Sequence, residues 1–138
     1  MSASLHSGDN LLDRQAVHLH WLLRTPLALV MLDHGVDHWL PGPAAFASPS
    51  GLPVAVSGLA SGLELLSGTA LLLGAWLGGW LTRAGAAAAL PVLLGAILMV
   101  HWGQWHSLPS ASHPLGGVAF PVTLSCLAIY LLVRGNEV

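Results

Sequence analysis

Two carboxylates and two imidazoles recur within one seven-residue segment, Asp33-His34-Gly35-Val36-Asp37-His38-Trp39. On an α-helix, residues four apart lie on the same face, so Asp33 pairs with Asp37 and His34 with His38 along one broad stripe. The segment ends an apolar run in a chain of which only 7% is Asp, Glu, Lys or Arg. Ionisable groups are costly inside hydrocarbon and usually have a function there. Such a stripe could ligate a metal ion or exchange protons with a substrate.

The composition indicates an integral membrane protein. Of the 138 residues 54% are hydrophobic, the mean hydropathy is +0.72, and four basic and six acidic residues cannot coat a soluble domain. The net charge of −2 offers no basic patch, so we expect no nucleic-acid partner. The single cysteine, Cys126, lies in an apolar run, and we expect a buried structural thiol.

Four apolar segments are each long enough to cross about 30 Å of hydrocarbon at about 1.5 Å per residue. We expect spans at about 22–40, 54–77, 84–105 and 118–133, in a single domain that covers residues 1–138. Residues 41–53 and 107–117 are expected to be loops, and residues 78–83 a tight turn. A short amphipathic helix at residues 11–21 precedes the first span. The predicted fold is all-α, an integral membrane four-helix bundle with a short N-terminal amphipathic helix.

The arginines predict the orientation of this bundle. Four spans place both termini on one side, and all four basic residues fall on that side: Arg14, Arg24, Arg83 and Arg134. The loops on the opposite side contain no Lys or Arg. By the positive-inside rule, both termini are cytoplasmic.

Polar residues from three spans reach one depth in this orientation. Counted from the arginine side at about 1.5 Å per residue, His38, Glu64 and His101 all lie in the outer leaflet. We expect Glu64 to face the bundle interior within reach of a histidine, because an ionised carboxylate in hydrocarbon must be paired. The expected site consists of polar and aromatic groups near this level: His34, Asp37, His38, Glu64, His101 and Trp102.

Three interpretations of this cluster remain open. In the first, the cluster binds a transition metal such as zinc, copper or iron, because imidazole and carboxylate suit these ions. Its ligands would be His34, His38, Glu64 and His101. In the second, the cluster lines a pocket for a quinone or another small substrate and exchanges protons with it. In the third, the polar groups only hydrogen-bond one another and hold the helices together.

The order of these features resembles the DoxX-like family of small four-helix bacterial membrane proteins. The resemblance rests on Arg24 and His34-Gly35 in the first span, on Gly62-Leu63-Glu64-Leu65-Leu66-Ser67-Gly68 in the second, on Thr82-Arg83-Ala84, and on His101. It implies catalytic roles for His34, Glu64 and His101 and a cofactor contact for Arg83. We add Asp37, His38 and Trp102 as cofactor contacts.

The family is similar to the membrane subunits of thiosulfate:quinone oxidoreductase. This similarity implies a function in redox reactions at the membrane. The Asp37-His38 pair, where many members have a proline and a lysine, and the additional His106 depart from the usual pattern and favour a bound metal or haem. We therefore expect a small subunit of an oxidoreductase or electron-transfer complex, near quinone in the bacterial inner membrane. Expected partners are the lipid bilayer and other membrane subunits or a second copy. The alternatives are a metal- or haem-binding membrane protein and a structural accessory subunit.

Overall fold

The computed structural model describes residues 20–137. Its α-helices are α2 (His20–Trp39), α3 (Pro43–Ser50), α4 (Val54–Leu77), α5 (Gly79–Gly95) and α6 (Ala119–Arg134), and a π-helix, η1 (Ala96–Val100), continues α5. No strand occurs in this part of the chain. The amphipathic helix expected at residues 11–21 lies, except for its last two residues, outside the described residues, and so does Arg14.

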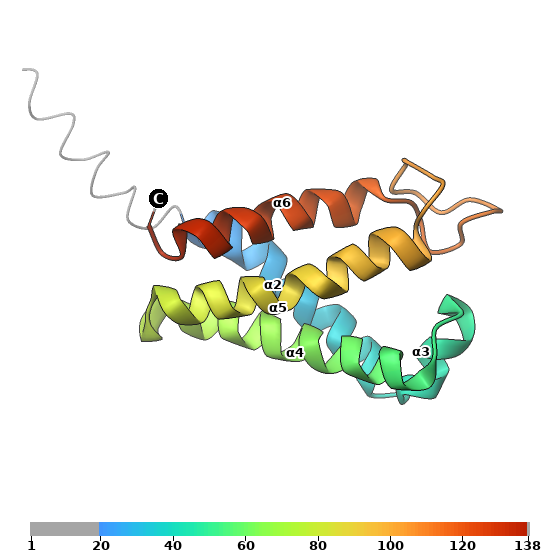
Figure 1. Cartoon of the computed structure of the whole chain (residues 1–138), viewed down its shortest axis with the longest axis horizontal. Coiled ribbons are helices and arrows are strands. Elements are labelled where there is room, and N and C mark those ends of the chain that lie inside the picture. Colours follow the sequence, from blue (N-terminus) through green and yellow to red (C-terminus); the bar gives the residue numbers. More distant parts are fainter. Residues whose placement is uncertain (1–19, 138) are drawn as a thin grey trace, which may run out of the picture.

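Two of the helices are long and apolar enough to cross a membrane. They are α4 and the continuous helix formed by α5 and η1, which together span Gly79–Val100. The apolar helix α6 is shorter, with 16 residues. Helix α2 has 20 residues and contains Arg24, Asp33 and Asp37 within its apolar sequence. In Figure 1, α4, α5 and α6 run roughly lengthwise and α2 passes behind them at an angle. The connections that follow α2 and η1 lie at the same end (Figure 1).

The helix bounds correct the sequence-based expectation in two places. The third helix begins at Gly79 and ends at Val100, so the expected bounds of 84 and 105 are wrong. A single residue, Gly78, turns the chain, because its φ of 121° lies in a region that only glycine adopts easily. At the other end, His101 leaves the helix with φ −106° and ψ 0°.

The segment expected to be a loop at residues 41–53 contains helix α3 instead. Pro43 occupies a first-turn position of α3, where its fixed φ favours helix and its missing N–H costs nothing. Gly42 before the helix (φ 92°) and Gly51 after it (φ 69°) change the chain direction. Ala47 is buried, so α3 packs back onto the bundle.

The core is formed by leucine, methionine and alanine side chains from all four long helices. Small residues let the backbones approach, as the glycine spacing of α4 predicts. A Cβ placed on Gly68 would lie 2.8 Å from the carbonyl oxygen of Ala28, so α2 and α4 meet there at backbone contact. The buried apolar core residues are Leu27, Ala28, Met31, Leu71, Ala86, Ala89, Leu93, Leu124, Ala128 and Leu131.

A buried polar network holds the end of the bundle opposite α3. Arg24 is fully buried, and its guanidinium donates to the carbonyl oxygen of Leu71 at 3.1 Å and to Oδ1 of Asn136. The same Oδ1 accepts a hydrogen bond from the Thr82 hydroxyl at 2.7 Å, and Nδ2 of Asn136 donates to the carbonyl oxygen of Gly74 at 2.9 Å. The residues after α6 are therefore tied to α2, α4 and α5.

Candidate functional site

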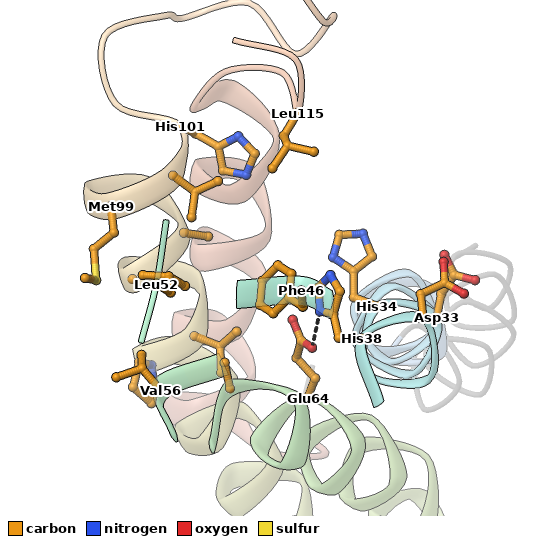
Figure 2. A pocket seen from close by; sticks show the side chains of 17 residues that line it. Asp33, His34, His38, Phe46, Leu52, Val56, Glu64, Met99, His101 and Leu115 are labelled. Carbon is orange, nitrogen blue, oxygen red and sulfur yellow. Dashed lines mark hydrogen bonds and ion pairs between the residues drawn. The ribbon is translucent and has the colours of Figure 1, made fainter. Parts of the chain in front are cut away.

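A cavity of about 490 Å³ lies between α2, α4 and the α5–η1 helix (Figure 2). Its volume is within the range of about 300–1,000 Å³ that is typical of small-molecule sites. Helix α3 and the segment before α6 also contribute to its wall. The lining residues are Asp33, His34, Asp37, His38, Phe46, Leu52, Val56, Ala60, Glu64, Pro91, Val92, Gly95, Ala96, Met99, Val100, His101 and Leu115.

The wall of this cavity contains an imidazole–carboxylate pair that joins α2 to α4. Nδ1 of His38 lies 2.9 Å from Oε2 of Glu64, and the side chains are 22% and 5% exposed, respectively. An ionised carboxylate accepts the Nδ1–H of the ring in a charge-assisted hydrogen bond. This geometry confirms that Glu64 faces the interior and meets a histidine of the first span.

Phe46 of α3 covers one face of the His38 ring. The ring centroids are 3.6 Å apart and the planes differ by 13°, so the two rings are stacked. Figure 2 shows Phe46 beside His38 at the cavity. The sequence analysis missed Phe46 because it treated residues 41–53 as a loop. The proline at 43 followed by an alanine-rich run was the available signal for a helix that could return this aromatic side chain to the bundle.

The four polar residues of the α2 stripe are buried to different extents. His34 is exposed and lies edge-on to His38, with ring centroids 5.7 Å apart and planes at 65°. Asp33 and Asp37 are also exposed, and Asp33 points away from Glu64 in Figure 2. His34, His38 and Glu64 thus form a series that runs from exposed to buried.

His101 lines the same cavity at a distance from the His38–Glu64 pair. It lies beside Leu115, across the cavity from Glu64 (Figure 2). Its Nδ1 is 2.8 Å from the carbonyl oxygen of Gly116, which fixes the ring against the segment before α6. The structure therefore brings the expected residues of three helices to one cavity but does not bring His101 into contact with the pair.

Three other expected residues lie away from this cavity or change their environment. Trp102 is 67% exposed and does not line it. Arg83 lies at the other end of the bundle, where Nη2 is 3.4 Å from the carbonyl oxygens of Val133 and Arg134. The expectation of a buried thiol is wrong, because Cys126 is exposed on α6.

The arrangement favours a small-molecule pocket over a metal centre. Among residues 20–137, no group of three or more His, Cys, Asp or Glu side chains is placed to hold a metal ion. A protein zinc site needs three or four ligands around one point. The expected ligand set of His34, His38, Glu64 and His101 instead spreads around the cavity, with one hydrogen bond within the set, between His38 and Glu64.

Comparison with known proteins gives one result. The family model described as DoxX matches residues 19–102, which is more than half of the chain. The matched part runs from α2 to just beyond η1 and contains every lining residue of the cavity except Leu115. No curated protein and no solved structure matches the chain.

Proposed function

The chain belongs to the DoxX family of membrane proteins, and on this premise we propose that it binds a quinone head group as a small subunit of a membrane oxidoreductase. The proposal places the head group in the cavity between α2, α4 and α5–η1. It assigns proton exchange to the His38–Glu64 pair and electron exchange to a redox cofactor of a partner subunit.

The observation that carries the proposal is the part-buried His38–Glu64 pair in a largely apolar cavity. Leu52, Val56 and Met99 give the cavity the apolar walls that suit an aromatic ring with a lipid tail. The Phe46–His38 stack provides a planar surface on which such a ring can pack. A pocket with these walls and a few convergent polar groups is the usual form of a small-molecule site.

The pair can move protons to and from such a ligand. Glu64 holds the Nδ1–H of His38, so Nε2 is the nitrogen that takes or gives a proton. The nearby carboxylate stabilises the imidazolium that forms when His38 takes a proton from a hydroquinone hydroxyl. His34 is exposed beside His38 and can pass this proton out of the cavity. In the reverse direction, the same groups supply protons to a quinone that is being reduced.

The proposal places the protein in the bacterial inner membrane as a four-helix bundle. α4 and α5–η1 have the length of a span, and α2 and α6 run beside them. The described arginines cluster at one end, where Arg24 meets Asn136 and Arg83 lies near Val133. This end is cytoplasmic by the positive-inside rule, and the cavity then lies in the outer half of the bundle.

A purely structural role for the pair is the second candidate. The His38–Glu64 hydrogen bond joins α2 to α4, and a polar contact between spans can stabilise a bundle by about 0.6 kcal/mol on average. This function would need no ligand in the cavity. A structural role predicts that filling the cavity has no functional consequence. The substitution experiment described next therefore tests both candidates.

The test uses two tryptophan substitutions at neighbouring positions of α4. Ala60 lines the cavity, whereas Leu59 is 65% exposed on the outer face of the helix. The full-length protein is placed in lipid nanodiscs, and the binding of decylubiquinone is measured. Ala60→Trp should abolish binding because its side chain occupies the cavity, and Leu59→Trp should bind as the wild type does. Absence of binding of both decylubiquinone and its reduced form to the wild type, or equal binding by both variants, would reject the quinone site.

A further inference from the structure

His101 presents one defined nitrogen to the cavity. Its Nδ1 is 2.8 Å from the carbonyl oxygen of Gly116, and a carbonyl can only accept a hydrogen bond. The ring must therefore carry its hydrogen on Nδ1. A neutral imidazole has one N–H, so Nε2 of His101 has a lone pair and acts as an acceptor. A group that binds the neutral ring there has to be a donor.

His38 has the same arrangement on another part of the cavity wall. Its Nδ1 is held by Oε2 of Glu64 at 2.9 Å, and an ionised carboxylate is an acceptor without a hydrogen to give. In the neutral ring, Nε2 of His38 is then also an acceptor. Phe46 covers one face of the ring, so a ligand reaches the ring from its edge or its other face.

Two acceptors on different walls of one cavity select a ligand with two donors. A hydroquinone carries a hydroxyl at each end of its ring and can donate to both histidines. A quinone carries a carbonyl at each end. The lone pairs of each carbonyl oxygen would then face the lone pair of a histidine nitrogen. A ligand that shields an acceptor from water without offering it a donor loses the hydrogen bond that water would make. We propose, on the basis of the quinone site above, that this cavity binds the reduced, hydroxyl-bearing form of its ligand in preference to the oxidised form.

The preference is measured with two probes that differ only in redox state. Binding of decylubiquinol and of decylubiquinone to the full-length protein in nanodiscs is compared without oxygen, so that each probe keeps its state. One mismatched hydrogen bond between ligand and protein corresponds to about a tenfold change in affinity. With one such bond at each histidine, we expect the wild type to bind decylubiquinol about a hundredfold more tightly than decylubiquinone.

The variant His101→Asn separates the ligand contact from the folding of the loop. An asparagine amide can place its N–H where Nδ1 of His101 lies and keep the bond to Gly116, but it has no atom at the position of Nε2. We expect this variant to fold and its preference for decylubiquinol to fall about tenfold, leaving the part that His38 contributes. His106→Asn is the matched control, because His106 is exposed in the same segment and does not line the cavity.

Each outcome decides the proposal. A preference for decylubiquinol that falls in His101→Asn and persists in His106→Asn supports it. Equal binding of the two probes by the wild type, or tighter binding of decylubiquinone, overturns the redox preference and leaves the quinone site standing. A full preference in His101→Asn, or its loss in His106→Asn, overturns the assignment to His101. If the wild type binds neither probe, the proposed function fails and the preference fails with it.

Discussion

Nδ1 of His38 lies 2.9 Å from Oε2 of Glu64, and this hydrogen bond joins α2 to α4 through two residues that are 26 positions apart in the sequence. The carboxylate is buried within an apolar bundle, where an ionised group requires a partner. The same bond orients the imidazole of His38 at the cavity wall. Stability and the proposed proton chemistry therefore depend on one contact, and variants of its two residues can separate them.

His38→Ala should destabilise the protein more than Glu64→Gln does. The alanine variant leaves the Glu64 carboxylate buried without its partner, which should lower the free energy of unfolding by about 1–3 kcal/mol. The glutamine variant keeps an oxygen that accepts the Nδ1–H of His38. Its free energy of unfolding should therefore fall by less than about 1 kcal/mol. Reversible unfolding in detergent measures both values. Equal losses would show that the charge of Glu64, rather than the hydrogen bond, stabilises the contact.

Phe46→Ala should weaken quinone binding while leaving the bundle folded. The substitution removes the ring that stacks on His38 at 3.6 Å. An aromatic pair contributes about 0.5–1.5 kcal/mol beyond its buried area, so we expect affinity for decylubiquinone to fall about three- to tenfold. Phe46→Tyr keeps the ring and is the control. A binding constant that is unchanged in Phe46→Ala would show that α3 does not shape the site.

Gly68→Ala should be destabilising, and Gly62→Ala should not be. A Cβ at Gly68 would lie 2.8 Å from the carbonyl oxygen of Ala28, whereas a Cβ at Gly62 has no neighbour within 4 Å. Overpacking at a tight contact typically costs about 1–3 kcal/mol. In an open helix position, alanine is favoured over glycine by about 0.5–1 kcal/mol. Thermal unfolding of the two variants should therefore shift in opposite directions, and a shared direction would contradict the close approach of α2 and α4.

Asn136→Ala should destabilise the bundle although it lies beyond the last helix. It removes the acceptor shared by Arg24 and Thr82 and the donor to Gly74. Leaving buried donors without an acceptor costs about 1–3 kcal/mol. Arg134→Gln is the control, because Arg134 is exposed and its side chain makes one weak contact, 3.4 Å to the carbonyl oxygen of Glu137. Unfolding free energies of the two variants should differ by at least about 1 kcal/mol.

Cysteine labelling of intact cells should place α3 and the segment between η1 and α6 outside the cytoplasm. Ser48 and Ala111 are exposed at that end of the bundle, and Glu137 is exposed at the other. In a background with Cys126 replaced, a membrane-impermeant thiol reagent should label Ser48→Cys and Ala111→Cys but not Glu137→Cys. If only Glu137→Cys were labelled, the orientation would be the opposite of the one proposed.

Local sequence patterns were sufficient for the bounds of α4 and for one contact of the site. The apolar run at 54–77 has the bounds of α4, because helix length and hydrophobicity are properties of a contiguous segment. The pairing of Glu64 with a histidine of the first segment also followed from sequence, since a lone carboxylate in an apolar helix has few polar partners. In both cases the physical constraint acts on residues that are close in sequence or few in number.

Only the tertiary structure decided which groups share the cavity and which are buried. Phe46 reaches His38 because α3 folds back onto the bundle, and Arg24 is buried because Asn136, 112 positions later in the chain, meets it. Because η1 ends at Val100, His101 lies outside the helix and against Gly116. This position makes Nδ1 the ring nitrogen that bonds to the carbonyl oxygen of Gly116. These outcomes depend on contacts between distant segments, whose free energies no local pattern of residues encodes.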